Sequence, residues 1–160
     1  MNLYSQATDK LSTIDFSDVA ALLPHSGAMV LLDKVIHFDP QRLTAALTVR
    51  NDDLFGDRSG VPAWVGIEYM AQAIAAYIGI KAKLAGEPIK LGYLLGTRRY
   101  SSNVSAFNAG TELMVYIENI IHDDKLGVFE CKISGDGIEV NANLNVYQPP
   151  TDIILKDYAK

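Results

Sequence analysis

The sequence predicts an α+β fold in which an antiparallel sheet wraps around one long apolar helix. Residues 64–80 are apolar on every face of a helix and are interrupted only by Glu68 and Gln72 before Lys81. Four strand-like segments follow, with turns short enough for antiparallel neighbours. A helix that is apolar all round must be buried, so the sheet has to cover it.

The segment before the long helix is predicted to hold a short helix, a hairpin and a loop. Asp15 or Ser17 can cap the short helix, and Pro24 ends it. The hairpin turns at Asp39 and Pro40, between two segments rich in Val, Ile and Leu. The predicted bounds are 15–23 for the helix, 29–38 and 43–49 for the two strands, and 51–62 for the loop.

The segment after the long helix is predicted to consist of four strands and short turns. Apolar and polar residues alternate strictly from Ile138 to Val146, which is the pattern of a strand with one buried face. Pro149 and Pro150 end this last strand. The predicted strands are 91–97, 113–121, 128–133 and 138–146, with turns at 108–110, 122–124 and 135–137.

Size and composition indicate one globular domain. The chain has 160 residues, and its apolar fraction of 49% is enough for a core without disulfides or metals. We expect a single domain over residues 1–160, with 1–12 and 151–160 as the segments that could be loose tails. Cys131 is the only cysteine, so no internal disulfide can form, and its apolar neighbours predict a buried thiol.

Charge and hydropathy limit the partners and the location. The net charge of -5 argues against a nucleic-acid partner, because phosphate neutralisation needs clustered Lys and Arg. The first residues are polar and do not form a signal peptide, which favours a cytoplasmic location. The apolar run 64–80 is short for a bilayer and carries a carboxylate, so we expect no membrane span.

Glu68 is the strongest candidate for acid-base chemistry. A single carboxylate in so apolar a helix is costly to ionise unless another group pairs with it, and such a carboxyl can donate a proton near neutral pH. Gln72 lies four residues later on the same helical face, where its amide can orient the carboxyl. The alternative is that Glu68 only reaches solvent at the helix start, where the helix dipole favours a negative charge.

His25 is the candidate base. It follows Pro24 and lies two residues before Gly27, between two predicted elements, where a histidine can be held against a ligand. The alternative is a surface or capping residue. His37 lies in a predicted strand and His122 in an acidic turn, and neither has a neighbouring motif. No His and Cys cluster predicts a metal site.

Two further features could contact a ligand. Val65 and Gly66 stand at the start of the long helix, where unpaired amides and the helix dipole could polarise a ligand carbonyl. An apolar strand contains Gly96 and ends with Arg98 and Arg99, which could meet a phosphate or an acidic partner. The alternative for these arginines is a solvated strand end.

Three segments resemble the 3-hydroxyacyl-acyl carrier protein dehydratases in their order and spacing. The segments are 23–35 (LPHSGAMVLLDKV), similar to the opening of those proteins, 62–72, similar to their central helix, and 93–96 (YLLG), similar to the next strand. Residues 60–72 with 94–100 are more similar still to a divergent dehydratase-like branch of bacterial aryl-polyene pigment clusters. The resemblance extends from about Leu22 to Leu113.

The resemblance implies a hotdog fold and a dimer whose active sites lie between the subunits, each with an acid and a histidine. Glu68 takes the position of the acid, and Gln72 that of a supporting glutamine. The family's loop histidine corresponds here to Leu54, and a family glycine near the helix start corresponds to Ala63. His25 can replace that histidine only if the fold brings it near Glu68 of the same or the partner subunit.

These residues predict dehydration of a 3-hydroxyacyl thioester on acyl carrier protein to the 2-enoyl thioester, in fatty-acid-like or aryl-polyene biosynthesis. His25 would remove the α-proton, while protonated Glu68 would assist the departing hydroxyl. The amides at Val65 and Gly66 would stabilise the enolate-like oxygen. The group at Gly96, Arg98 and Arg99 would contact the pantetheine or the carrier protein.

No cofactor is expected beyond the phosphopantetheine that carries the substrate. The expected partners are acyl carrier protein and a second hotdog subunit, in a homodimer or a heterodimer. Two alternatives stay open: an acyl thioesterase, in which the carboxylate activates water, and a catalytically silent subunit that pairs with an active dehydratase. Met70 and Ile74 would either line an acyl channel or fill the core.

Overall fold

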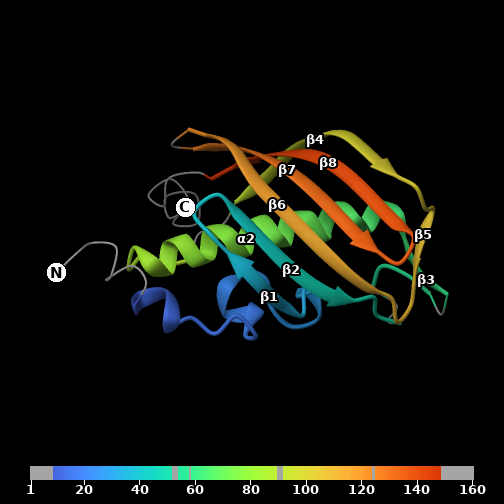
Figure 1. Ribbon diagram of the computed structural model, residues 1–160, viewed down its shortest axis with the longest axis horizontal. Coiled ribbons are helices and arrows are strands. Elements are labelled where there is room, and N and C mark those ends of the chain that lie inside the picture. The colour runs from blue at the N-terminus through green and yellow to red at the C-terminus, as the bar shows by residue number, and fades with distance from the viewer. Residues whose placement is uncertain (1–8, 52–53, 58, 90–91, 124, 149–160) are drawn as a thin grey trace, which may run out of the picture.

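The computed structural model of the protein describes residues 9–51, 54–57, 59–89, 92–123 and 125–148. A six-stranded antiparallel sheet lies across one long helix, α2 (Gly66–Leu84), and its strands cross the helix obliquely (Figure 1). The strand order in this sheet is β1-β2-β6-β7-β8-β4. The predicted arrangement of an antiparallel sheet around a long central helix is therefore confirmed.

Short elements complete the fold around this sheet. The strands of the large sheet are β1 (Lys34–Phe38), β2 (Arg42–Thr48), β4 (Tyr93–Ser102), β6 (Glu112–His122), β7 (Leu126–Gly135) and β8 (Ile138–Tyr147). A second sheet pairs β3 (Gly60–Pro62) with β5 (Ala106–Asn108). The 3-10 helices are η1 (Val19–Leu22), η2 (Gly27–Met29) and η3 (Ala63–Val65).

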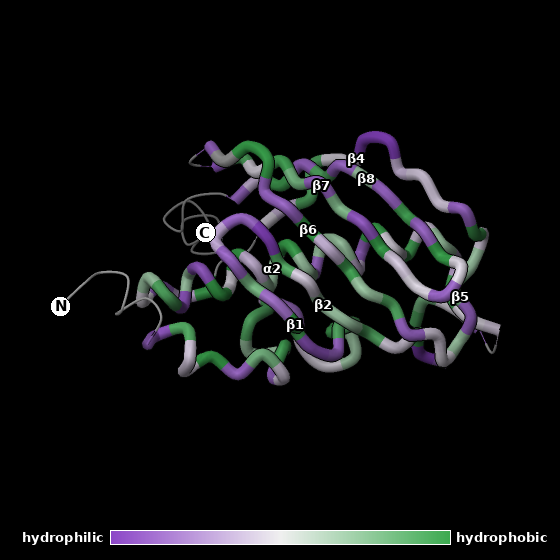
Figure 2. Tube along the Cα trace, in the orientation of Figure 1, coloured by the Kyte–Doolittle hydropathy of each residue, from purple (hydrophilic) through white to green (hydrophobic). Residues whose placement is uncertain are grey.

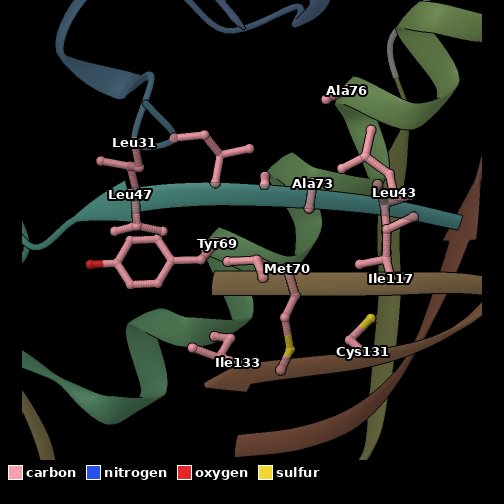
Figure 3. Packing of buried hydrophobic residues seen from close by; sticks show 14 of the residues in the cluster. Leu31, Leu43, Leu47, Tyr69, Met70, Ala73, Ala76, Ile117, Cys131 and Ile133 are labelled. Atoms are coloured by element: carbon pink, nitrogen blue, oxygen red, sulfur yellow. The ribbon is translucent and has the colours of Figure 1, made fainter. Parts of the chain in front are cut away.

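The core lies between α2 and the inner face of the sheet. Met70 and Ala73 of α2 are fully buried beside Leu43, Ile117 and Cys131 from three adjacent strands (Figure 3). Burying a side chain as large as Met70 contributes about 1.5–3 kcal/mol. Cys131 is buried as predicted, and burial raises the pKa of its thiol to about 12. The sheet therefore stabilises the helix through apolar burial.

The strands alternate between buried and exposed residues as the sequence predicts. The buried residues of β8 are Val140, Ala142, Leu144 and Val146. Figure 2 shows the same alternation of hydrophobic and hydrophilic residues along the strands. The turns predicted at 108–110 and 135–137 both form, and Gly110 and Gly137 there have φ of 84° and 68°. Glycine adopts this conformation without strain.

The long helix is buried on most sides, as the sequence predicts, but the apolar run starts outside the helix at an exposed residue. Trp64 lies in η3, before α2 begins, and 62% of it is exposed. By length and composition, Ala63–Leu84 could cross a membrane, but 67% of its apolar window is buried inside the structure. Coverage by the sheet accounts for this composition, and the absence of a membrane span stays a prediction.

The predicted helix over 15–23 is wrong, since only the single turn η1 forms there. Neither Asp15 nor Ser17 caps it; the N-cap is Asp18, with no side-chain hydrogen bond. Asp15 instead accepts hydrogen bonds from the Ser17 hydroxyl (2.6 Å) and the Ser17 N–H (2.9 Å), which lower the pKa of its carboxyl. These local bonds stabilise a turn in competition with a helix.

The predicted strand over 29–38 begins only at Lys34, because the backbone before it has other partners. Residues 27–29 form η2. The Leu31 N–H then donates to the Gln72 side chain on α2 (2.9 Å) instead of to a strand. A side chain distant in sequence therefore decides the conformation of this segment.

The strand predicted over 91–97 continues to Ser102, with irregular pairing after Leu94 and after Arg98. The arginines consequently lie inside β4, not at its end as predicted. The predicted loop over 51–62 ends in the short strand β3. Residues 9–12, part of the segment predicted as a possible loose tail, are helical. Some predictions include residues outside the described part of the chain, namely 1–8, 52–53, 58, 90–91, 124 and 149–160.

Candidate active site

His25 and Glu68 are distant in sequence but adjacent in the structure. His25 lies between η1 and η2, and Glu68 lies in the first turn of α2. The distance between His25 Nε2 and Glu68 Oε1 is 3.5 Å. The two side chains are 27% and 34% exposed, so a ligand can reach both. The fold thus brings His25 near Glu68 of the same subunit, which is the condition for a joint acid-base role.

Gln72 is fully buried and contacts both Glu68 and the backbone that follows His25. Its amide nitrogen donates to the Met29 carbonyl (2.7 Å) and to Glu68 Oε1 (3.1 Å). Its carbonyl oxygen accepts the Leu31 N–H. The sequence predicted the contact with Glu68 but not the two backbone contacts. One side chain therefore fixes the segment that follows His25 and also orients the carboxyl group.

The sequence predicted an isolated carboxylate in apolar surroundings, but Glu68 has polar neighbours in the structure. It has Gln72 and His25 as neighbours, and a third of its side chain is exposed. Its place in the first helical turn also favours a negative charge, through the helix dipole. A carboxyl group beside an imidazole is able to exchange a proton with it, and paired acid-base chemistry needs this exchange.

The two ring nitrogens of His25 have different surroundings. Nδ1 is buried and has no hydrogen-bond partner among the described residues. Nε2 points to Glu68, so it is the nitrogen that can reach a ligand. Its separation of 3.5 Å from the carboxylate is long for a hydrogen bond, and such contacts often shorten only when substrate binds.

The His25–Glu68 pair lies beside an apolar pocket of about 170 Å³. The other lining residues are Pro24, Ala71, Ile74, Ala75, Ile78, Gly92, Leu94 and Val146. Two polar side chains at the edge of an apolar pocket suit a ligand with an apolar body and a polar reactive end. Ile74 lines this pocket, whereas Met70 belongs to the core under the sheet.

Sequence reasoning named Ile74 as a possible lining residue but missed the rest of the pocket wall. Ala71, Ala75 and Ile78 follow Glu68 at spacings of three and four residues, which place all four on one helical face. The spacing was a usable signal. In a helix that is apolar on all sides, however, an open face cannot be distinguished from a buried one until the position of the sheet is known.

The start of α2 is engaged by contacts within the chain. The Gly66 N–H donates to the carbonyls of Ala63 and Trp64 in η3, so in this structure it is not free to bind a ligand carbonyl. That amide would have to leave these bonds to stabilise an enolate-like oxygen. The predicted contact of Val65 and Gly66 with a thioester therefore stays a prediction.

Gly66 also has a packing function that the sequence did not reveal. A Cβ at this position would collide with the Tyr100 hydroxyl of β4. That hydroxyl donates a hydrogen bond to the Ala63 carbonyl. Burial raises the pKa of Tyr100 from 10.0 to about 12, so the hydroxyl remains a donor even at alkaline pH. The close approach of Tyr100 explains why position 66 has no side chain.

The predicted carrier-contact residues of β4 do not line the pocket at His25 and Glu68. Arg98 and Arg99 are exposed, and Arg99 has a positive φ of 55° where the pairing with β8 is irregular. Arg99 instead lines a depression formed by residues of the large sheet, with Tyr116 and Glu118. Contact of Gly96, Arg98 and Arg99 with pantetheine or a carrier protein stays a prediction.

The remaining candidates lie outside this pocket. His37 Nε2 approaches Asp39 Oδ2 (3.3 Å) at the β1–β2 turn and is exposed. The side chain of His122 is outside the described part of the chain. Within that described part, no group of three or more His, Cys, Asp or Glu side chains could hold a metal ion.

The curved antiparallel sheet around one long helix is the arrangement of hotdog proteins. The structure is similar to that of a mutant thioesterase from Pseudomonas aeruginosa (16% identity, TM-score 0.57, covering 86% of this chain and 96% of that one). It is also similar to the PaaI protein from the phenylacetic acid degradation operon of E. coli (14%, 0.57, 91% and 99%). These likenesses show the hotdog fold alone.

Two findings identify the family. The family model described as ApeP dehydratase, ApeP-like, matches residues 17–158. The chain is also 34% identical to a chain of the dehydratase heterocomplex ApeI:P from Xenorhabdus doucetiae, with a TM-score of 0.79 and coverage of 89% of this chain and 97% of that one. The protein therefore belongs to the ApeP-like dehydratase family, which confirms the resemblance predicted from sequence. No significant match was found among curated proteins.

Proposed function

We propose that this dehydratase-family protein removes water from a 3-hydroxyacyl thioester carried on acyl carrier protein and forms the 2-enoyl thioester. The observation that carries this proposal is the approach of His25 Nε2 to Glu68 Oε1, 3.5 Å apart, beside an apolar pocket. The apolar pocket suits the acyl chain, and the His25–Glu68 pair suits the carbons next to the thioester. The phosphopantetheine arm carries the substrate, and no other cofactor enters the reaction.

The elimination needs one base and one acid. His25 Nε2 takes the α-proton, the electrons of that C–H bond form the double bond, and the β-hydroxyl leaves with the proton of Glu68 as water. His25 is then protonated and Glu68 is ionised. A proton transfer across the short gap between them restores both groups. Gln72 positions the carboxyl through its hydrogen bond to Glu68 Oε1.

We further propose that a second hotdog subunit pairs with β4. This strand is at the edge of the large sheet and exposes Tyr93, Leu94 and Leu95, the last by 60%. Exposed edges with large apolar side chains are sites where another strand can add. Leu94 also lines the pocket, so a partner at β4 would help to enclose it. The heterocomplex from Xenorhabdus doucetiae supports a different hotdog chain as this partner.

The same heterocomplex favours one alternative, in which this chain is a silent subunit that shapes the pocket of an active partner. The absence of a histidine at Leu54 supports that alternative. Thioesterases also share the fold, but that likeness does not extend beyond the fold.

The deciding experiment is a mass-spectrometric assay of the purified protein with 3-hydroxyacyl carrier protein, with and without a second hotdog dehydratase subunit. Wild type and an exposed-histidine control, His37→Ala, are expected to release one water per substrate, whereas Glu68→Gln and His25→Ala are not. Free acid and thiol would indicate a thioesterase. Equal activity of all four proteins only when the second subunit is present would indicate a silent partner.

A further inference from the structure

A second cavity adjoins the candidate pocket. It has a volume of about 260 Å³ and lies between the C-terminal half of α2, the start of β7 and the end of β8. Its lining includes the apolar Leu126 and Phe129 and the charged residues Lys81, Glu87 and Lys125. Ile78 and Val146 line both cavities, so the two cavities meet at these residues.

One face of α2 connects the two cavities. Glu68, Ala71, Ala75 and Ile78 are only partly buried, whereas most of the helix is fully buried. The alanines leave space beside the helix, and Ile78 is the first branched, partly buried side chain on this face after Glu68. With a rise of 1.5 Å per residue, Ile78 lies about 15 Å along the helix from Glu68.

We infer that the two cavities form one acyl path, and that Ile78 determines which chain lengths the protein accepts. The inference rests on the proposed function, because the acyl chain begins at the His25–Glu68 pair. A chain shorter than about 15 Å ends before Ile78. A longer chain passes between Ile78 and Val146 and enters the second cavity, where the partly exposed Leu126 supplies apolar surface. The substrate class is therefore medium- to long-chain acyl thioesters.

The path predicts how affinity depends on chain length. Each methylene group buried in an apolar site contributes about 0.8 kcal/mol, which is about fourfold in affinity. In the wild type, affinity should rise at about this rate beyond the length that reaches Ile78. If the second cavity is not part of the path, the rise stops at that length.

The test measures binding of acyl-pantetheine amides, from butyryl to octadecanoyl, by titration calorimetry. The amide replaces the thioester, so binding is observed without turnover. Ile78→Trp should stop the rise in affinity at Ile78 and change the affinity of short chains less than about twofold, since short chains bury no methylene beyond that point. Ile78→Ala should shift the preference toward longer chains. Ile36→Trp, at an exposed position of β1 that lines neither cavity, is the matched control.

Two results would overturn the inference: a wild-type affinity that does not increase beyond the length reaching Ile78, or affinities of Ile78→Trp and Ile78→Ala that vary with chain length as in wild type. The proposed function fails separately. If affinity rises with chain length but 3-hydroxyacyl carrier protein is not dehydrated, the acyl path is supported and the proposed reaction is contradicted. If dehydration occurs but affinity does not depend on chain length, the proposed reaction is supported and the acyl path is contradicted.

Discussion

The β7–β8 hairpin and the segment 24–33 that carries His25, here called the His25 segment, are stabilised in different ways. The hairpin pairs continuously from Gly135↔Ile138 to Leu126↔Tyr147, between neighbours in the sequence. The His25 segment is attached through Gln72, which lies on α2 and bonds Met29 and Leu31. Local pairing therefore builds the scaffold, whereas contacts from distant segments hold the His25 segment: Gln72 from α2 at Met29 and Leu31, and β2 at Asp33.

Substitution of Met70 should destabilise both regions and have the largest effect. Met70 is fully buried between α2 and the sheet, so Met70→Ala removes apolar contacts and leaves a cavity. We expect the free energy of unfolding to fall by about 2–5 kcal/mol. Chemical denaturation would measure it, and a loss below about 1 kcal/mol would show that the helix does not depend on the sheet at this point.

Substitution of Gln72 should separate the two regions. Gln72→Leu keeps the volume but leaves the Leu31 N–H and the Met29 carbonyl without their partner. A buried polar group without a partner costs about 1–3 kcal/mol. Hydrogen exchange should therefore accelerate in the His25 segment and remain slow in the β7–β8 hairpin. Equal acceleration in both regions would contradict the local role assigned to Gln72.

Substitution of Gly137 should affect the hairpin and spare the His25 segment. Gly137 has a φ of 68° and open space where a Cβ would stand, so Gly137→Ala pays only the conformational cost of the left-handed region. That cost is about 1–2 kcal/mol. Gly96→Ala is the matched control, because Gly96 also has open space but no positive φ. Thermal unfolding of the two variants should differ, and equal melting temperatures would count against the argument.

The contact between Tyr100 and Ala63 should produce the smallest effect, at high pH. Burial raises the pKa of Tyr100 from 10.0 to about 12, so the folded protein retains a proton that the unfolded chain loses first. Stability contributed by this group is present below pH 10 and is lost as the pH rises toward 12. Denaturation midpoints across this range should decline less in Tyr100→Phe than in wild type. An identical decline would exclude Tyr100 as its source.

Much of the fold could be predicted because its signals are local. The alternation from Ile138 to Val146 specifies a strand with one buried face, and the apolar run that became α2 specifies a buried helix, whichever residues surround them. The helix predicted over 15–23 does not form because Asp15 and Ser17 bond to each other. The same two residue types can cap a helix or stabilise a turn, so the sequence does not distinguish these two structures.

The sequence by itself determined the sheet, the central helix and the presence of Glu68 and Gln72 on one helical face. Tertiary structure alone decided that His25 meets Glu68, that Gln72 fixes the backbone at Met29 and Leu31, and that one face of α2 remains open. The physical reason is the sequence distance over which each kind of interaction acts. Periodicity and turn residues act over a few positions, whereas these contacts join segments whose approach depends on how the whole sheet packs on the helix.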